Sequence, residues 1–399
     1  MITVFGKSED CCGCTACYNI CSIQAITMKL DDEGFLYPII DKELCIDCGM
    51  CKEVCAFQNG YNTFNNIDKP EVYAIKHRSN KVRENSSSGG AFTAISDCML
   101  LKNGVLYGVT YDDEFRVIHQ REETAEGRNK LRGSKYVQSD LKKIFKKVKE
   151  DLVNGRNVLF TGTGCQVAGL NSYLEKLKVD TKKLLTVDII CHGVPSPRIF
   201  AEYISYLEKK NKGKIEQYYF RSKVYGWGYT EEVVYKNRKS DHTSALLQVY
   251  KELFYSNLCL RPSCYRCKYT NFLRPADITI GDYWGIENYF PEFADSLGVS
   301  AMIINTKKGK ASFSELKENI EIIPSNIYDC AARQRNLYSP TPISLRRSEF
   351  WNDYLQYGFE YIIKKYTTYG FKGKIKKYSV FLFRKLGLLK LVRKAPKKG

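Results

Sequence analysis

Short apolar runs separated by polar turns extend over most of the chain and predict an alternation of strands and helices. Two such runs, 25–30 and 35–40, flank Asp31-Asp32-Glu33-Gly34, a turn sequence that predicts a β-hairpin. Further β-branched or apolar runs predict strands at 72–76, 105–111, 158–161 and 184–190. Helical patterns lie between them, at 90–102, 140–154 and 166–177. A β-rich, aromatic stretch follows at 214–304, and helical patterns return from Tyr328, so the fold class is expected to be α+β.

Positive charge is concentrated at the C-terminal end. The net charge is +18, and residues 361–399 hold 13 Lys or Arg and no Asp or Glu. The first 360 residues are nearly balanced, with 49 basic and 44 acidic side chains, which argues against a nucleic-acid-binding face. From position 371 basic and apolar residues are mixed, and three interpretations stay open: a helix on an anionic membrane surface, a solvated tail, or a partner-docking helix.

The sequence shows neither a membrane span nor a secretory signal. No apolar stretch reaches the roughly 18 residues of a membrane-spanning helix. The first ten residues contain no apolar segment of the kind that directs secretion. We therefore expect a cytoplasmic protein, either free or peripheral at the inner face of the membrane.

The cysteines are clustered, as metal ligands are. Of sixteen, nine lie at 11–55, where the spacing C-x2-C-x2-C-x3-C occurs twice. In two-cluster ferredoxins the fourth cysteine of each run binds the other [4Fe–4S] cluster. The expected ligand sets are Cys11, Cys14, Cys17 with Cys55, and Cys45, Cys48, Cys51 with Cys21.

Residues 1–60 therefore resemble a bacterial two-cluster ferredoxin. The sequence departs from that pattern at Ser22 and Ala56, where proline usually follows the fourth cysteine. Zinc is the alternative metal, although it favours separate C-x2-C pairs over this repeated four-cysteine spacing.

Six segments beyond position 71 resemble the family of coenzyme F420 hydrogenase/dehydrogenase β subunits. In chain order they are SSSGGAF at 86–92, RGSKYVQS at 132–139, FTGTGCQVAGL at 160–170, VDIICHGVPSP at 187–197, CYRCKY at 264–269 and ADITIGDYWG at 276–285. The resemblance implies an FAD-binding oxidoreductase that carries its own [4Fe–4S] cluster beside the flavin.

The resemblance also implies a division of the chain. The expected parts are a ferredoxin domain at 1–60, a domain like the N-terminal part of those β subunits at 71–155, a domain like their C-terminal part at 156–330 and a basic helical tail at 331–399. The polar, asparagine-rich residues 61–70 are expected to be a linker. The whole would be a two-cluster ferredoxin module, an α/β flavin-binding body and a tail.

Three segments are expected to contact the flavin. Ser87, Ser88, Gly89 and Gly90 precede a predicted helix, whose N-terminus would bind the pyrophosphate; a plain helix cap is the alternative. Lys135 and Tyr136 are expected against the flavin ring, where a positive charge favours the reduced anion; a surface lysine is the alternative. Gly162, Thr163, Cys165 and Gln166 follow a strand, at the end where α/β sheets bind ligands.

A further cluster is expected on the spacing C-x4-C-x2-C, formed by Cys259, Cys264 and Cys267. The fourth thiolate should come from a strand end, either Cys191 or Cys165, and Cys191 is favoured because it directly follows its strand. Zinc is the alternative, since three cysteines and His192 would also suit it. His192 and Lys135 are the candidate catalytic residues; His192 could relay protons, and a structural hydrogen bond is its simpler role.

The sequence thus predicts an iron–sulfur flavoprotein with two [4Fe–4S] clusters in the N-terminal module, a third cluster and FAD. It would pass electrons to or from a two-electron substrate, such as coenzyme F420 or another small organic acceptor. Its partner would be a redox protein or a small-molecule electron carrier. Two other functions stay open: a non-catalytic electron-transfer adaptor of a larger complex, and a module that tethers such a complex to a membrane.

Overall fold

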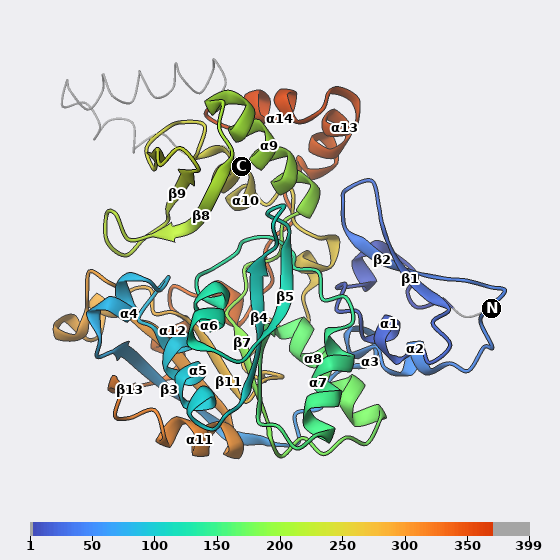
Figure 1. The fold of residues 1–399 in the computed structure, drawn as a ribbon, viewed down its shortest axis with the longest axis vertical. Helices are drawn as coiled ribbons and strands as arrows, with labels where there is room; N and C mark the ends of the chain where they lie inside the picture. The colour runs from blue at the N-terminus through green and yellow to red at the C-terminus, as the bar shows by residue number, and fades with distance from the viewer. Residues whose placement is uncertain (1–2, 370–399) are drawn as a thin grey trace.

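An eight-stranded mixed sheet forms the centre of the computed structural model, which describes residues 3–369 (Figure 1). The strand order across the sheet is β13 (Ile320–Ser325), β3 (Asn66–His77), β12 (Ser300–Thr306), β11 (Ile278–Asp282), β7 (Leu184–Ile189), β6 (Val158–Thr163), β4 (Val105–Tyr111) and β5 (Val117–Glu122). The neighbours β4, β6, β7 and β11 are parallel, and the outer strands are antiparallel. The carboxyl ends of the four parallel strands therefore meet at one edge of the sheet. The structure is thus consistent with the expected α+β fold class.

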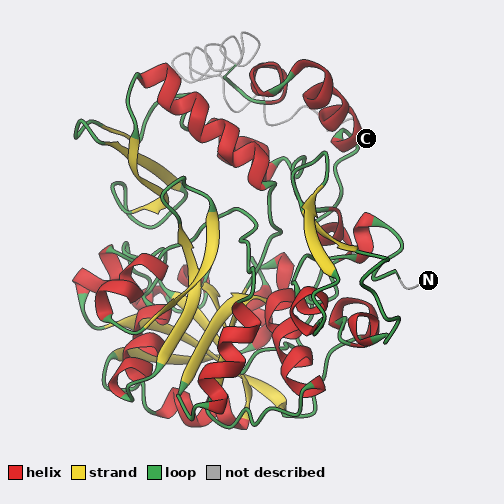
Figure 2. Cartoon of the chain, turned by 45° about the vertical axis from the view of Figure 1, so that its right-hand side comes forward, coloured by secondary structure: helices red, strands yellow, loops and turns green. Residues whose placement is uncertain are grey.

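Alternate side chains of the parallel strands pack into two different cores. On β6, Val158 and Phe160 join the core that contains α7 (Ile144–Val153) and α8 (Gly164–Lys176). Leu159 joins the core that contains α5 (Ala91–Leu101) and α11 (Lys307–Ser314). Figure 2 shows helices on either side of the sheet. Strands buried on both faces are continuous apolar runs, which is why the sequence pattern located β4, β6 and β7 within a few residues.

A smaller antiparallel sheet lies above the large one in Figure 1. It consists of β8 (Ile215–Ser222), β9 (Thr230–Tyr235) and β10 (Ser240–Asp241). The helices α9 (Pro197–Asn211), α10 (Val249–Tyr255), α13 (Arg347–Tyr357) and α14 (Phe359–Tyr366) complete this subdomain. Its core is rich in aromatic rings, and Tyr111 at the carboxyl end of β4 packs against that core. The subdomain thus covers the edge of the sheet at which the parallel strands end.

The N-terminal module packs against the body beside α7 and α8. It contains α1 (Ala16–Ile20), the hairpin of β1 (Ile26–Leu30) and β2 (Leu36–Ile40), α2 (Met50–Glu53) and α3 (Ala56–Asn59). The hairpin pairs Ile26 with Ile40 through to Leu30 with Leu36, which confirms the expected turn. Module and body share one core, and a Cβ on Gly169 of α8 would lie 2.7 Å from Cys14 Sγ. A glycine at that position is what lets the cysteine loop contact the helix.

The structure corrects the expected linker. β3 starts at Asn66, inside the polar segment 61–70, because Asn66 pairs with Thr306 of β12 beyond an irregularity that adds residues on the β3 side. Strands from 71–155 and from 156–330 share the large sheet. The remaining helices are α4 (Asn80–Glu84), α6 (Ala125–Leu131) and α12 (Ile327–Ala331), with 3-10 turns at Ser8–Asp10, Pro262–Arg266, Ile286–Asn288, Pro291–Phe293 and Arg335–Leu337.

No helix within residues 3–369 combines the length and the apolar character needed to cross a bilayer. The expected helix from position 371 lies outside the described residues.

Candidate cofactor sites

The carboxyl ends of the parallel strands open into a large cavity of about 440 Å³, a volume typical of cofactor pockets. Thr161, Ile189 and Gly281 line it from β6, β7 and β11. Tyr229 and Tyr255 close it from the aromatic subdomain. The cavity therefore lies where open α/β sheets bind ligands, between the large sheet and its cover.

Most of the residues predicted to contact a flavin line this large cavity: Ser87, Ser88, Gly90, Lys135, Tyr136, Gly162, Thr163 and Gln166. The Ser87 hydroxyl accepts a hydrogen bond from the Ser134 N–H at 2.9 Å, which joins the loop before α5 to the loop after α6. Both loops thus form one wall of the cavity.

Gly89 and Cys165 were also predicted to contact the flavin, but they do not line the large cavity. A Cβ on Gly89 would lie 2.5 Å from the carbonyl oxygen of Ile75 and 2.6 Å from the nitrogen of Ser300. Gly89 is therefore needed for the loop to pack on β3 and β12, so a substitution there would disturb the fold before it affected any ligand. Cys165 lines a neighbouring cavity.

Lys135 is positioned by a helix end. Its ammonium donates to the carbonyls of Lys130, Leu131 and Arg132, at 3.0, 3.2 and 2.9 Å, and so caps the C-terminus of α6. Burial, together with the charge of Arg132, lowers the pKa of Lys135 to about 7. Near neutral pH this side chain can therefore hold or release a proton at the wall of the large cavity.

Asp282 and Trp284 line the cavity without having been predicted, and the same holds for Arg221 and Trp227, which contact these two residues. Arg221 is buried and donates to both carboxylate oxygens of Asp282 at 2.9 Å. The Trp227 indole N–H donates to the same carboxylate at 2.7 Å, and its ring stacks on Trp284 with centroids 4.5 Å apart. Arg333 also lines the cavity. Asp282 and Trp284 stand in the segment ADITIGDYWG and could have been found there, whereas nothing in the local sequence marks Arg221.

A second cavity, here called the cysteine cavity, adjoins the large one. Five cysteines line it: Cys12, Cys165, Cys191, Cys264 and Cys267. Burial, followed by the charges of neighbouring thiols, raises the pKa of Cys191 to about 12 and that of Cys267 to about 11. The Val194 N–H points at the Cys264 sulfur, 3.4 Å away. Such N–H donors stabilise thiolates, so the cavity is suited to ligands that bind through ionised sulfur.

Cys259 does not belong to this group. It is fully buried in the aromatic core, and its thiol points at the Leu253 carbonyl, 3.7 Å away. The structure thus separates Cys259 from Cys264 and Cys267, and it brings both candidate strand-end cysteines, Cys165 and Cys191, to the cavity. The spacing C-x4-C-x2-C predicts Cys259 as a ligand together with Cys264 and Cys267, whereas in the structure Cys259 is not in the wall of the cysteine cavity.

His192 lies in the wall between the two cavities, together with Cys191. Its Nε2 is 2.8 Å from Asn257 Oδ1, and its ring packs edge-on against Phe254. Burial lowers the pKa of His192, and hydrogen bonds with Asn257 and Asn336 partly offset that effect. The side chain is therefore held neutral, with one nitrogen committed to a structural hydrogen bond.

The cysteines of the N-terminal module form two groups. The inner group is Cys11, Cys14, Cys17 and Cys55: burial, then the charges of the other three thiols, raises the pKa of Cys17. The outer group is Cys21, Cys45, Cys48 and Cys51, which line a common pocket. Cys14 and Cys17 are buried, and Cys48 is exposed. Cys51 of the outer group is buried as well, but Cys14 of the inner group lies against Gly169 of α8, so the inner group is the one nearer the body.

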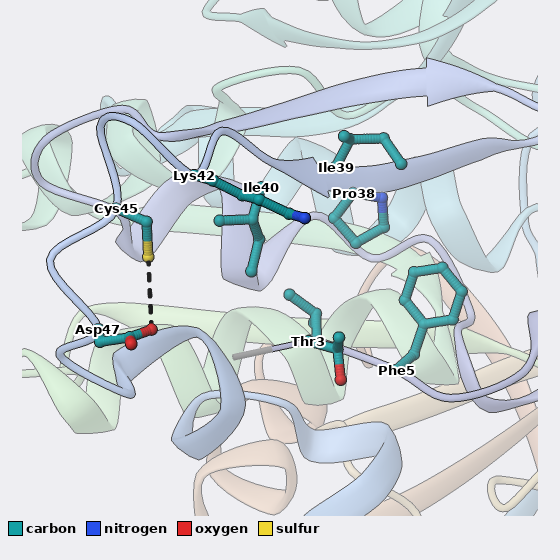
Figure 3. A pocket seen from close by; sticks show the side chains of 9 residues that line it. Thr3, Phe5, Pro38, Ile39, Ile40, Lys42, Cys45 and Asp47 are labelled. Atoms are coloured by element: carbon teal, nitrogen blue, oxygen red, sulfur yellow. Dashed lines mark hydrogen bonds between the residues drawn. The ribbon is translucent and has the colours of Figure 1, made fainter. Parts of the chain in front are cut away.

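A pocket of about 470 Å³ opens beside the outer group, between the first residues and the hairpin. Figure 3 shows Cys45 and Asp47 at one end of it and Phe5 at the other. The Cys45 sulfur is 4.0 Å from the Asp47 carboxylate. The cysteine therefore borders a solvent-accessible surface.

No three His, Cys, Asp or Glu side chains among residues 3–369 converge in the way that a single metal ion requires. A [4Fe–4S] cluster is larger than an ion and spreads its four thiolate ligands around a cavity. The three groups of cysteines, two around pockets and one close enough for its thiols to affect one another electrostatically, have the donor chemistry that such a cluster needs.

A buried hydrogen-bond network supports the large cavity from behind. His119 Nε2 donates to the Thr161 carbonyl at 3.1 Å, and its Nδ1 accepts from the Ser139 hydroxyl at 2.9 Å. Gln166 in turn donates to that hydroxyl at 2.9 Å. Burial lowers the pKa of His119 to about 4.

We expect this histidine to make stability depend on pH. In the unfolded chain His119 binds a proton near pH 6.5, and in the folded chain it does so only near pH 4. This difference in pKa corresponds to about 3 kcal/mol of the free energy of unfolding. The stabilisation is complete above pH 6.5 and is lost as the pH falls through 4. His119→Gln can make similar hydrogen bonds without titrating, so thermal unfolding midpoints between about pH 4.5 and 7.5 should fall less steeply for the variant. Equal slopes would contradict this role.

Residues 155–328 match the family model for the C terminus of the beta subunit of coenzyme F420 hydrogenase/dehydrogenase. The F subunit of the F420H2 dehydrogenase from Methanosarcina mazei is 21% identical over 336 residues, which are 79% of this chain and 85% of that protein. A chain of the F420-reducing [NiFe] hydrogenase complex from Methanosarcina barkeri is 17% identical with a TM-score of 0.45, over 64% of this chain and 82% of that chain. The matched family region contains the body's cluster-candidate cysteines, and the loops at 86–90 and 132–136 lie outside it.

Proposed function

Because the chain belongs, through residues 155–328, to the family of coenzyme F420 hydrogenase/dehydrogenase β subunits, we propose that it is an iron–sulfur flavoprotein oxidoreductase. It would hold FAD in the large cavity and three [4Fe–4S] clusters at the three cysteine groups. The observation that carries the proposal is the shared wall: Cys191 and His192 line both the cysteine cavity and the large cavity. Groups bound in these two cavities would be neighbours, as electron transfer requires.

The large cavity suits FAD in charge and in shape. Ser87, Ser88 and Gly90 lie at the N-terminus of α5, where free N–H groups favour a pyrophosphate. Arg132 and Arg333 add positive charge to the wall, and rings such as that of Trp284 offer flat surfaces. When bound, a flavin exchanges single electrons with clusters and electron pairs with organic substrates. Lys135 would hold or release the accompanying proton at the wall.

The third cluster would be bound by Cys165, Cys191, Cys264 and Cys267. All four line the cysteine cavity, and the Val194 N–H would stabilise the Cys264 thiolate. The buried Arg274 also lines this cavity, but Asp188 pairs with it at 2.8 Å and neutralises its charge. Cys12 is the fifth cysteine there and comes from the N-terminal module.

The N-terminal module would bind the other two clusters at its inner and outer groups. Exposed Cys48 marks the side at which a redox partner protein or a small electron carrier would exchange electrons. The inner group lies between that side and the body, because Cys14 lies against Gly169 of α8 and Cys11 lies beside Arg261. In this proposal 1–60 remains the ferredoxin domain, and 71–155 and 156–330 form the flavin-binding body. Of the expected tail at 331–399, α13 and α14 pack into the aromatic subdomain of that body.

Cofactor analysis of the anaerobically purified full-length chain tests the proposal. We expect about one FAD and about twelve iron atoms with matching acid-labile sulfide per chain. Coenzyme F420, nicotinamides and quinones would then be screened as two-electron substrates. A chain that holds iron but no flavin, and reduces none of them, would refute the enzyme and support an electron-transfer adaptor.

A further inference from the structure

Arg261 is a fully buried cation that extends from the body into the N-terminal module. The other buried arginines among the described residues each pair with an aspartate: Arg83, Arg128, Arg221 and Arg274. No carboxylate within residues 3–369 forms an ion pair with Arg261, and the nearby Glu33 is held by Arg347 at 2.8 Å. A buried charge without a counter-charge is strongly unfavourable, so an anion is expected beside this guanidinium.

The contacts of Arg261 show where that anion lies. Nε donates to the Cys11 carbonyl at 2.8 Å, and Nη1 donates to Gln138 Oε1 at 2.9 Å. Nη2 donates to the Leu36 carbonyl at 3.1 Å and lies 3.6 Å from Cys11 Sγ. The three oxygen acceptors are neutral, so the Cys11 sulfur is the hydrogen-bonding group that can become an anion.

The cysteine loop closes directly on the guanidinium. A Cβ on Gly13 would lie 2.9 Å from Arg261 Nη1, and Gly13 has a φ of +72°. The guanidinium also lies over the Tyr37 ring, 4.1 Å from its centroid. Arg261 is thus enclosed by the N-terminal module, although it belongs to the body and stands three residues before Cys264.

We propose that Arg261 is the counter-charge of the cluster bound by the inner group, and that it raises the reduction potential of that cluster; this rests on the proposed function. Reduction adds one negative charge to a cluster. A buried cation stabilises that charge strongly, because neither water nor salt screens it there. Arg261, which belongs to the body, thereby makes the inner cluster a better electron acceptor than the cysteines of the module alone would make it.

Two substitutions remove the field of Arg261 in different ways. Arg261→Gln deletes the charge. Gln138→Glu leaves Arg261 in place and gives it a carboxylate of the same size at the present 2.9 Å contact, which neutralises it, at the loss of the Gln138 hydrogen bond to the Cys12 carbonyl. Each should lower the ratio of reduced to oxidised inner cluster about tenfold at a fixed applied potential, equivalent to about 59 mV for a one-electron couple. The ratio is read by EPR during an anaerobic redox titration of the full-length protein.

The controls separate charge from packing. Arg261→Lys keeps the charge and should stay closer to the wild-type ratio than Arg261→Gln does. Arg116→Gln removes an exposed arginine of the body, ion-paired with Asp112, and should change no cluster. The inner cluster is identified as the signal that Cys17→Ala removes.

Different failures have different meanings. A full iron content with an unchanged ratio in both Arg261→Gln and Gln138→Glu would overturn the role of Arg261 and leave the proposed function intact. Equal shifts in Arg261→Lys and Arg261→Gln would overturn it as well, since charge would not be the cause. A wild-type chain that binds no iron would refute the proposed function itself. If Arg261→Gln does not accumulate as folded protein, the ratio of reduced to oxidised inner cluster in Gln138→Glu decides whether Arg261 has this role.

Discussion

Replacement of Cys165 by serine is expected to remove one cluster, so that iron falls from about twelve to about eight atoms per chain. The serine hydroxyl is rarely ionised and is a hard donor, so it replaces a thiolate poorly at iron–sulfur sites. Cys165 lines the cysteine cavity with Cys191, Cys264 and Cys267. The inner and outer groups of the N-terminal module are separate sites, and their clusters should persist. Iron and acid-labile sulfide would be counted in anaerobically purified protein.

Cys259→Ser is the matched control. Cys259 was grouped with the ligands by its spacing, but it is buried in the aromatic core with its thiol directed at the Leu253 carbonyl. A serine hydroxyl can make the same hydrogen bond, so this variant should keep all the iron. If iron were lost from Cys259→Ser and kept by Cys165→Ser, Cys259 would be a ligand, as the spacing C-x4-C-x2-C predicts, and Cys165 would not.

Ser87→Asp is expected to abolish flavin retention while the clusters remain. Ser87 lies beside the N-terminus of α5 in the wall of the large cavity. A carboxylate there is compatible with the helix dipole and can still accept from the Ser134 N–H, so folding should be preserved. It would repel a pyrophosphate by about 4 kcal/mol at roughly 4 Å, a loss of nearly three orders of magnitude in affinity. FAD released on denaturation would be measured against protein and iron.

Ser87→Asn is the neutral control of matched size and should keep most of the flavin. Full flavin occupancy in Ser87→Asp would show that the loop before α5 does not contact the pyrophosphate. Equal loss of flavin from both variants would show that the shape of the side chain at position 87, and not its charge, prevents binding. Gly89 is unsuitable for this experiment, because any side chain there collides with the backbone of β3 and β12.

The sequence by itself determined the features that depend on neighbours along the chain. The turn Asp31–Gly34 and its flanking apolar runs predicted the β1–β2 hairpin, because a hairpin is stabilised by residues that are close in sequence. The continuous apolar runs predicted β4, β6 and β7, because strands buried on both faces have no polar alternation. The repeated four-cysteine spacing also predicts two ligand sets for the module, since a tight loop limits which sulfurs can share a site, and that assignment stays a prediction.

Only the tertiary structure decided how distant residues meet. Cys165 and Cys191 follow β6 and β7, and they reach the same cavity because those strands are parallel neighbours in the sheet. Cys259 is close to Cys264 in sequence, yet it packs into the aromatic core instead. Lys135 caps α6, and Arg261 extends from the body into the N-terminal module. Which groups a charged side chain meets is set by strand order and by packing between modules, and local spacing carries no record of either.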